Sequence, residues 1–352
     1  MDEELGNLGS GPILSICIPT YNRADLLGEA LDAIFAQVNG GNSAAIEVVV
    51  SDNASPDATA DVVQGMALAH PNVRVRYSRQ ATNVGPDRNI LDVMFMGKGL
   101  YVLLLSDDDL LLPGALDAIL ARLRQQPGLN ALALNLCGFS TNAAMLGPPS
   151  YRLEADRLIL DRGDAILYLG TKLTFVSSLI VRRDLFQDRD YSGSLGTYFP
   201  HSHVFLDALA HEGGMLAMKN PGLAVRENAS VSYNLYVAFL TGFSKVMEYA
   251  EESGFPRSAT KKVLRSHRRW VAGMTTRFVS SGVMGWRQLG RWDAIRRLYE
   301  VYGVDPYILI RVVPVLLLPI WAVRVLAKLY KGGGWCKRLL RTKVSQLIAS
   351  ES

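Results

Sequence analysis

Short apolar runs that end in polar clusters recur along the first third of the chain and constrain its fold more than any other feature. Strand-like runs occupy Leu14–Pro19, Ile46–Val50, Val73–Tyr77 and Leu103–Leu105. Segments with helical spacing follow the first three runs, at Ala24–Gln37, Ala58–Leu68 and Asp87–Met96. Repeated strand–helix units predict an α/β fold, in which helices cover a mainly parallel sheet.

The fourth run ends in three consecutive carboxylates, Asp107, Asp108 and Asp109. A buried strand does not end in three adjacent like charges without a counter-charge, because burying unpaired charges is costly. Carboxylate oxygens are typical ligands of Mg²⁺ and Mn²⁺, and these ions usually reach a protein together with phosphate groups. An acidic turn ahead of a helix start at Pro113-Gly114 is the alternative interpretation.

The polar clusters follow successive strands, and parallel strands bring their carboxyl ends to one edge of the sheet, where ligands bind. We therefore expect Asp52 to accept a hydrogen bond from a base N–H and Arg88 to neutralise a diphosphate. Asp107 and Asp109 would hold a metal that bridges the phosphates. Taken singly, a residue such as Asp52 more often forms a turn and a residue such as Arg88 usually lies on a solvated helix face, so the argument depends on the ordered set.

The ordered motifs resemble those of family 2 glycosyltransferases with the GT-A fold, a Rossmann-like architecture. They are Pro19-Thr20-Tyr21-Asn22, Ser51–Asp57, Asn83-Val84-Gly85 with Arg88-Asn89, and Ser106–Asp109. The resemblance is strong over roughly residues 12–125 and continues weakly to about residue 230.

The resemblance implies an inverting transfer of a sugar from a nucleoside diphosphate donor, assisted by Mn²⁺ or Mg²⁺. It implies that Asp109 and Asp107 are the outer residues of a DxD motif and bind the metal, with Asp109 the more direct ligand. The donor-binding residues that it implies are Pro19, Thr20, Tyr21, Arg23, Asp52, Asn53, Asn83, Arg88, Asp107 and Asp108.

The catalytic base is expected in the middle of the chain, where the family usually has a Glu-Asp pair. Here the segment Tyr198–Asp207 replaces that pair and offers His201, His203 and Asp207. Pro200 favours a helix start, and a helix from there places His203 and Asp207 four residues apart on one face. Histidine titrates near neutral pH and is suited to take the acceptor proton, but the choice among the three stays open. This segment resembles an abequosyltransferase-like branch that adds deoxysugars to O-antigen intermediates.

The chain has 352 residues and a formal net charge of +4, enough for a catalytic domain with an appended segment. We expect a GT-A domain over residues 12–235, with nucleotide-sugar binding in 12–125 and the acceptor side in 126–235. A helical extension would occupy 236–305 and a basic, membrane-associating tail 306–352. The polar stretch Asn220–Asn234 is expected to form either a lid or a surface loop.

From residue 306 to residue 350 the tail contains eight Lys or Arg residues and no Asp or Glu. Its twelve uncharged residues Val312–Val323 are shorter than the roughly 20 that span a bilayer, so we expect them to lie in the interface of an anionic membrane. A buried C-terminal helix with a solvated basic end is the alternative.

The N-terminal residues 1–11 have no apolar core, so we expect no secretory signal and a peripheral location at the cytoplasmic face of the plasma membrane. The expected partners are a nucleoside diphosphate sugar and a lipid-linked or polysaccharide acceptor of cell-surface glycan synthesis. No nucleic-acid-binding motif is present in the sequence. The competing interpretation is a non-catalytic scaffold that binds nucleotide sugars or glycans.

Overall fold

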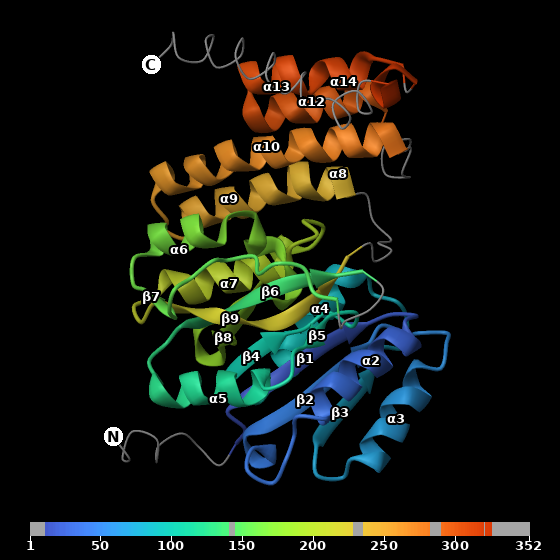
Figure 1. Cartoon of the computed structure of the whole chain (residues 1–352), viewed down its shortest axis with the longest axis vertical. Helices are drawn as coiled ribbons and strands as arrows, with labels where there is room; N and C mark the ends of the chain where they lie inside the picture. The colour runs from blue at the N-terminus through green and yellow to red at the C-terminus, as the bar shows by residue number, and fades with distance from the viewer. Residues whose placement is uncertain (1–10, 141–144, 228–234, 282–289, 320, 326–352) are drawn as a thin grey trace. The chain divides into compact units, whose positions relative to one another are not determined.

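The computed structural model describes residues 11–140, 145–227, 235–281, 290–319 and 321–325 (Figure 1). The chain forms two compact units. Unit 1 comprises Met1–Ser230 and Lys245–Val263, and unit 2 comprises Val231–Ser244 and Leu264–Ser352. Lys245–Val263, which the sequence placed in the helical extension, therefore belongs to the same unit as the sheet.

The first four long strands of unit 1 are parallel neighbours, in the order β3 (Arg74–Arg79), β2 (Ile46–Asp52), β1 (Leu14–Thr20) and β4 (Tyr101–Leu104). The apolar residues of β1, β2 and β4 are buried on both faces of the sheet, as strands between two helical layers require, whereas those of the edge strand β3 are only partly buried. The strand register places Thr20 opposite Asp52 at the carboxyl ends of β1 and β2. The predicted parallel arrangement is thus confirmed for this half of the sheet.

The other half of the sheet is mixed, which the strand–helix pattern did not predict. Strand β8 (Leu179–Arg182) is antiparallel to both β4 and β6 (Ala131–Phe139). Strand β9 (Met215–Arg226) is parallel to β6 but antiparallel to β5 (Leu110–Leu111) and β7 (Arg157–Ile159).

Strand β9 also corrects the expectation of a lid or loop over Asn220–Asn234. Residues Asn220–Arg226 are part of this strand, because the apolar Leu223 and Ala224 are fully buried and pair with β5 and β6. Residues 228–234 lie outside the described part of the chain.

Helices cover both faces of the sheet. Helices α2 (Ala24–Phe35), α3 (Thr59–Ala69) and α5 (Ala115–Gln125) contribute buried side chains to one core cluster with alternate residues of β1, β2, β4 and β6. Helix α4 (Pro86–Met96) packs on the opposite face, where it contacts β1, β2 and α7 (Pro200–Ala210). Helix α6 (Arg162–Leu169) contacts α7 in turn.

Unit 2 is helical within its described residues and has its own core. Its helices include α8 (Leu235–Val237), α12 (Arg291–Tyr302), α13 (Pro306–Arg311) and α14 (Val313–Leu317). Two further helices, α9 (Phe243–Glu252) and α10 (Arg257–Ser281), cross from one unit to the other. The apolar stretch Val312–Val323 contributes Val312, Leu316 and Val323 to this core, whereas its Leu317 and Trp321 are exposed. Among the described residues, the helices are too short or too polar to span a bilayer.

The loop between α4 and β4 approaches β1 so closely that only glycine fits. A Cβ on Gly99 would lie 2.6 Å from the backbone nitrogen of Ser15, whereas a Cβ on Gly65 in α3 would meet nothing within 4 Å. We expect Gly99→Ala to lower the free energy of unfolding by about 1–3 kcal/mol through overpacking. The control Gly65→Ala should raise it by about 0.5–1 kcal/mol, because alanine favours a helix interior. Urea unfolding of both variants measures the difference, and equal effects would contradict this packing.

Candidate functional site

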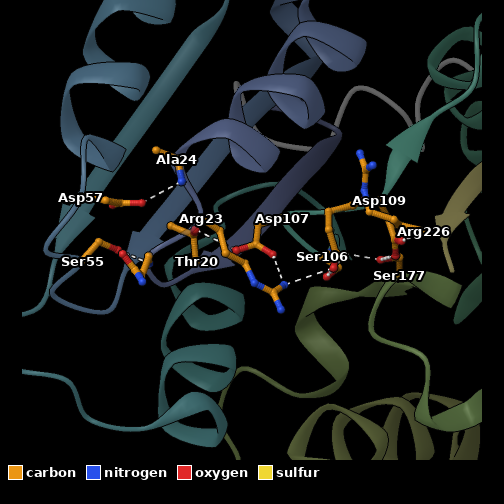
Figure 2. A network of polar contacts seen from close by, with 12 residues as sticks. Thr20, Arg23, Ala24, Ser55, Asp57, Ser106, Asp107, Asp109, Ser177 and Arg226 are labelled. Atoms are coloured by element: carbon orange, nitrogen blue, oxygen red, sulfur yellow. Dashed lines mark hydrogen bonds and ion pairs between the residues drawn. The ribbon is translucent and has the colours of Figure 1, made fainter. Parts of the chain in front are cut away.

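The carboxyl ends of β1, β2 and β4 bring the predicted polar residues together (Figure 2). Thr20, the last residue of β1, donates a hydrogen bond to Asp107 with an oxygen–oxygen distance of 2.8 Å. The loops after β1 and β2 are joined as well, since Ser55 Oγ accepts from the Asn22 amide and Asp57 accepts from the Ala24 amide. The expected convergence of these strand ends is therefore present in the structure.

Arg23 is the counter-charge that the buried carboxylates need. Its guanidinium lies 2.9 Å from a carboxylate oxygen of Asp107 and 3.1 Å from one of Asp108. Burial raises the pKa of Asp107, while the nearby Arg23 lowers it and Asp108 raises it further, and the net change is upward. One guanidinium thus compensates two carboxylates only in part.

Asp109 is turned toward a different set of groups. Ser177 donates its hydroxyl to one oxygen at 2.7 Å, and the amide of Arg226 donates to the other at 3.1 Å. Burial and the neighbouring charge of Asp108 raise the pKa of Asp109 to about 7. No cationic side chain forms an ion pair with Asp109 among the described residues, so its charge is poorly compensated in the protein alone.

This donor set fits a divalent metal that arrives with a diphosphate. Among the described residues, no three acidic, histidine or cysteine side chains converge as a closed metal cage would require. Mg²⁺ bound with substrate phosphates usually needs only one or two protein carboxylates, and phosphate and water oxygens complete its shell. Asp109 and Asp107 offer hard oxygen atoms beside a buried, excess negative charge, which is the environment that a cation would stabilise.

Asp52 is fully buried, and its two oxygens accept hydrogen bonds from within the protein. The Ser55 amide donates to one oxygen at 2.8 Å and the Tyr77 hydroxyl to the other at 2.7 Å. Asn53 and Asn83, also predicted to bind the donor, contact each other through their amide groups at 3.0 Å. A ligand would reach Asp52 through lone pairs that these two donors leave free.

The remaining predicted donor-binding residues lie at more open positions. Tyr21 is 44% exposed beside the end of β1, and Pro19 within that strand is partly exposed. Arg88 projects from the first turn of α4, is largely exposed, and forms an ion pair with Asp92 at 2.7 Å. The structure therefore places Arg88 near the Asn83–Gly85 loop but pairs its guanidinium with a carboxylate of its own helix.

Residues with an unfavourable, left-handed backbone conformation occur at the same motifs. Among the described residues, three that are not glycine have positive φ: Asn22 at 54°, Ala54 at 62° and Tyr198 at 68°. This conformation costs a residue with a Cβ atom about 1–2 kcal/mol, so it persists only where surrounding contacts hold it. Asn22 and Ala54 lie in the loops after β1 and β2, and Tyr198 precedes the helix of the three candidate bases.

His201, the first of those candidates, is closed off from ligands. It is 1% exposed, packs edge-on against Phe199 and Phe205, and its Nε2 lies 3.0 Å from the carbonyl oxygen of Thr174. Because a carbonyl only accepts, Nε2 must carry the proton, and the buried Nδ1 has no partner among the described residues. Burial lowers the pKa of His201 to about 4.

Asp207 is equally enclosed but fully hydrogen-bonded. The hydroxyls of Tyr191 and Tyr249 donate to its two oxygens at 2.7 and 2.9 Å, and Arg189 lies 3.1 Å away. These three donors hold the carboxylate in place. His203, one turn earlier on α7, donates from Nδ1 to the carbonyl of Phe199 and packs on the ring of Tyr249.

Three residues of the site were missed by sequence reasoning. Ser177 contacts both Asp109 and the Ser106 amide, and its signal was a hydroxyl within the apolar run Phe175–Val181. Arg226 contacts the carbonyl of Asp108 with its side chain, but it lay in the stretch expected to form either a lid or a surface loop.

Asp87 is the third. Its carboxylate accepts from the amides of Gly196 and Tyr198, at 2.8 and 3.1 Å. It thereby ties the start of α4 to the segment that precedes α7. Its sequence signal was only an acidic residue in a first helical turn.

The sequence is similar to known glycosyltransferases. Residues 15–188 match the family model "Glycosyl transferase family 2". The abequosyltransferase RfbV of Salmonella typhimurium is 26% identical over 74% of this chain and 82% of its own length. A Campylobacter jejuni GalNAc(5)-diNAcBac-PP-undecaprenol beta-1,3-glucosyltransferase is 36% identical over 32% of this chain and 34% of its own length.

Solved structures share the fold at low sequence identity. Staphylococcus aureus TarS 1–349 in complex with UDP-GlcNAc has a TM-score of 0.61 and 16% identity, and the match covers 92% of this chain and 93% of TarS 1–349. The mannosyltransferase PcManGT of Pyrobaculum calidifontis, in complex with GDP-Man and Mn²⁺, has a TM-score of 0.52 and 17% identity over 97% of this chain and 86% of its own. With the motifs and the sheet described above, these similarities show that the chain belongs to the family 2 glycosyltransferases and has the GT-A fold.

Proposed function

We propose that this protein transfers a sugar, with inversion, from a nucleoside diphosphate donor to a lipid-linked or polysaccharide acceptor in cell-surface glycan synthesis. The observation that carries the proposal is the buried carboxylate cluster at the ends of β1 and β4, where Arg23 compensates Asp107 and Asp108 but Asp109 has no cationic partner among the described residues. A deoxysugar donor is favoured by the similarity to an abequosyltransferase.

The donor side of the proposed reaction uses residues at and just after the ends of β1, β2, β3 and β4. Pro19, Thr20, Tyr21 and Arg23 would border the nucleoside and the phosphates, and Asp52, Asn53 and Asn83 would contact the base side. Arg88 and Asp108 complete the set. Mn²⁺ or Mg²⁺ on Asp109 and Asp107 would offset the charge that develops on the departing diphosphate.

The acceptor side must supply a base, because the attacking hydroxyl loses a proton as it bonds to the anomeric carbon. His201, His203 and Asp207 remain the candidates, all on α7. The Asp87 contacts support a base near the start of this helix, since they fix that segment to the donor loop.

A lipid-linked acceptor is supported by the basic tail and by a relative whose name includes an undecaprenol-linked substrate. The exposed Trp292, Ile310 and Trp321 of unit 2 suit a lipid headgroup region. We therefore place the protein at the cytoplasmic face of the plasma membrane, as a peripheral protein that attracts anionic lipid.

The metal assignment predicts that Asp109→Ala and Asp107→Ala lose Mn²⁺-dependent hydrolysis of nucleotide sugars. Metal stabilisation of the leaving diphosphate is commonly worth several kcal/mol, so the rate should fall by about a thousandfold or more. A panel of UDP-, GDP-, CDP- and dTDP-sugars, with and without EDTA, provides the measurement. Asp61→Asn, on the exposed side of α3, is the control. Wild-type protein that hydrolyses no member of the panel would favour the scaffold function.

The donor-site assignment predicts that Arg88→Ala weakens nucleoside diphosphate binding about ten- to hundredfold, because a charge-assisted hydrogen bond is worth about 1.5–3 kcal/mol. Asp52→Asn should have a similar effect if Asp52 accepts from the base. Asp92→Asn releases Arg88 from its ion pair and should leave binding unchanged or stronger. Calorimetry compares the three, and unchanged affinity in both Arg88→Ala and Asp52→Asn would contradict the assignment.

The tail prediction requires a variant that leaves the core of unit 2 intact. Removing residues from Tyr307 onward would also remove Ile308, Val312 and Leu316, which are buried in that core. Instead, replacing the basic residues after Val325 by Gln should release the protein from anionic vesicles, with an effect that shrinks as salt rises. These residues are Lys328, Lys331, Lys337, Arg338, Arg341 and Lys343. Lys261→Gln with Lys262→Gln, both exposed in α10, is the control, and sedimentation with the vesicles is the assay.

A further inference from the structure

A polar pocket of about 330 Å³ lies in unit 1 on the side of α7 that carries His203. Its walls come from α7, from the segment 190–197 and from α9, all within this unit. The chemistry-bearing residues of the lining are Asp190, His203, Lys245, Glu248, Tyr249 and Glu252. The donor motifs do not contribute to this pocket, and the reaction described so far assigns it no ligand.

His203 lines this pocket and has an unused hydrogen-bond acceptor. The residue is only 5% exposed, and its Nδ1 lies 3.1 Å from the carbonyl oxygen of Phe199. Because a carbonyl only accepts, the proton is on Nδ1, and Nε2 keeps a free lone pair in the neutral ring. Among the described residues Nε2 has no hydrogen-bond partner, and it is not one of the fully enclosed polar atoms.

Three charged side chains of the pocket lining have no bonding partner among the described residues. Lys245, Glu248 and Glu252 form no ion pair or hydrogen bond through their side chains with any described residue, whereas Asp190 accepts from Ser192 in its own turn. Carboxylates accept from hydroxyl groups and an ammonium donates to them, so this lining suits a ligand rich in hydroxyls. The ring of Tyr249, on which His203 packs, adds apolar surface to the lining.

Two structural links tie the pocket to the donor side. Thr197 lines the pocket, and its neighbours Gly196 and Tyr198 donate their amides to Asp87 at the start of α4. On the other side of α7, His201 contacts the carbonyl of Thr174, three residues before the Ser177 that holds Asp109. The start of α7, the helix that carries His203, is therefore fixed to α4 through Asp87 and to the segment Thr174–Ser177 through His201.

Asp207 holds two residues of the pocket lining in place. Tyr191 and Tyr249, whose hydroxyls donate to Asp207, both line the pocket. Asp207 does not line it, and its three donors already occupy its oxygens. It is a positioning residue that holds two pocket walls together.

We propose that this pocket binds the acceptor sugar and that His203 Nε2 takes the proton of the attacking hydroxyl. The inference rests on the proposed glycosyl transfer. The hydroxyl oxygen forms a bond to the anomeric carbon of the donor, and its proton passes to Nε2. The bond from the anomeric carbon to the diphosphate oxygen breaks, and the electron pair leaves with the nucleoside diphosphate.

Of the three candidate bases, only His203 both lines a pocket and has a nitrogen lone pair, on Nε2, that no described residue uses. His201 has its Nε2 protonated by the Thr174 contact and its Nδ1 enclosed by protein. Asp207 accepts from two tyrosines and an arginine. Either would have to break native contacts before touching a substrate hydroxyl.

The first test is kinetic and uses full-length protein. The donor is the nucleotide sugar that wild-type protein hydrolyses fastest, and the acceptors are a panel of 4-nitrophenyl hexosides and 6-deoxyhexosides. His203→Asn keeps an N–H that can replace Nδ1–H toward Phe199 but lacks Nε2. We expect its kcat for transfer to fall about a hundredfold or more, with nucleotide affinity unchanged, as general-base loss typically does.

The combined variant Glu248→Gln with Glu252→Gln should instead raise the acceptor KM about tenfold and leave kcat near the wild-type value. His70→Gln, at the end of α3, is the histidine control. Normal kcat in His203→Asn, with acceptor KM unchanged in the glutamine variant, would overturn the inference while leaving the glycosyl transfer intact.

The second test does not depend on turnover. Diethyl pyrocarbonate modifies accessible, neutral imidazoles, so mass spectrometry should find His203 labelled and the enclosed His201 and His267 unlabelled. A saturating 4-nitrophenyl glycoside should protect His203 but not the exposed His211. Protection in a protein that transfers to no acceptor would retain the pocket and reject the enzyme function. Labelling that no glycoside reduces would reject the pocket.

Discussion

Burial of adjacent carboxylates at the end of β4 is the constraint around which the site is organised. Asp107, Asp108 and Asp109 are each less than 10% exposed, and one guanidinium, that of Arg23, pairs with two of them. Thr20 donates to Asp107, and Ser177 and the Arg226 amide donate to Asp109, so residues of β1, of the turn before β8 and of β9 meet at this cluster. Loss of any of these donors would leave buried charge less compensated, and a bound cation would stabilise the cluster further.

The three candidate bases show how one short helix can carry polar residues with different tasks. Their side chains are all almost fully buried, yet His201 packs among aromatic rings, Asp207 joins two tyrosines, and His203 borders a pocket. Residue type and spacing could not separate them. What separates them is which lone pairs the neighbouring groups leave free, and those neighbours come from segments far away in the sequence.

The first half of the fold was predictable because each strand and helix there follows its predecessor directly. Strands β1 and β2 begin where the apolar runs Leu14–Pro19 and Ile46–Val50 begin, and their polar ends converge as expected. The second half was not predictable in this way, because β8 and β9 are antiparallel to some of their neighbours, an arrangement that a strand–helix repeat does not specify. A polar sequence such as Asn220–Arg226 resembles a loop until its long-range partners are known. The same limit hid Ser177 and Asp87.

The contact between Asp87 and the segment before α7 has a thermodynamic consequence. A group that bonds to two segments can transmit a shift in one of them to the other, and any such coupling is reciprocal. If nucleotide binding orders the start of α4, the same ordering is felt at Gly196 and Tyr198, and hence at the helix that follows. Nucleotide binding would then change the affinity for the acceptor by the same factor by which acceptor binding changes the affinity for the nucleotide. The effects of substitutions in the two segments on binding free energy would therefore not be additive.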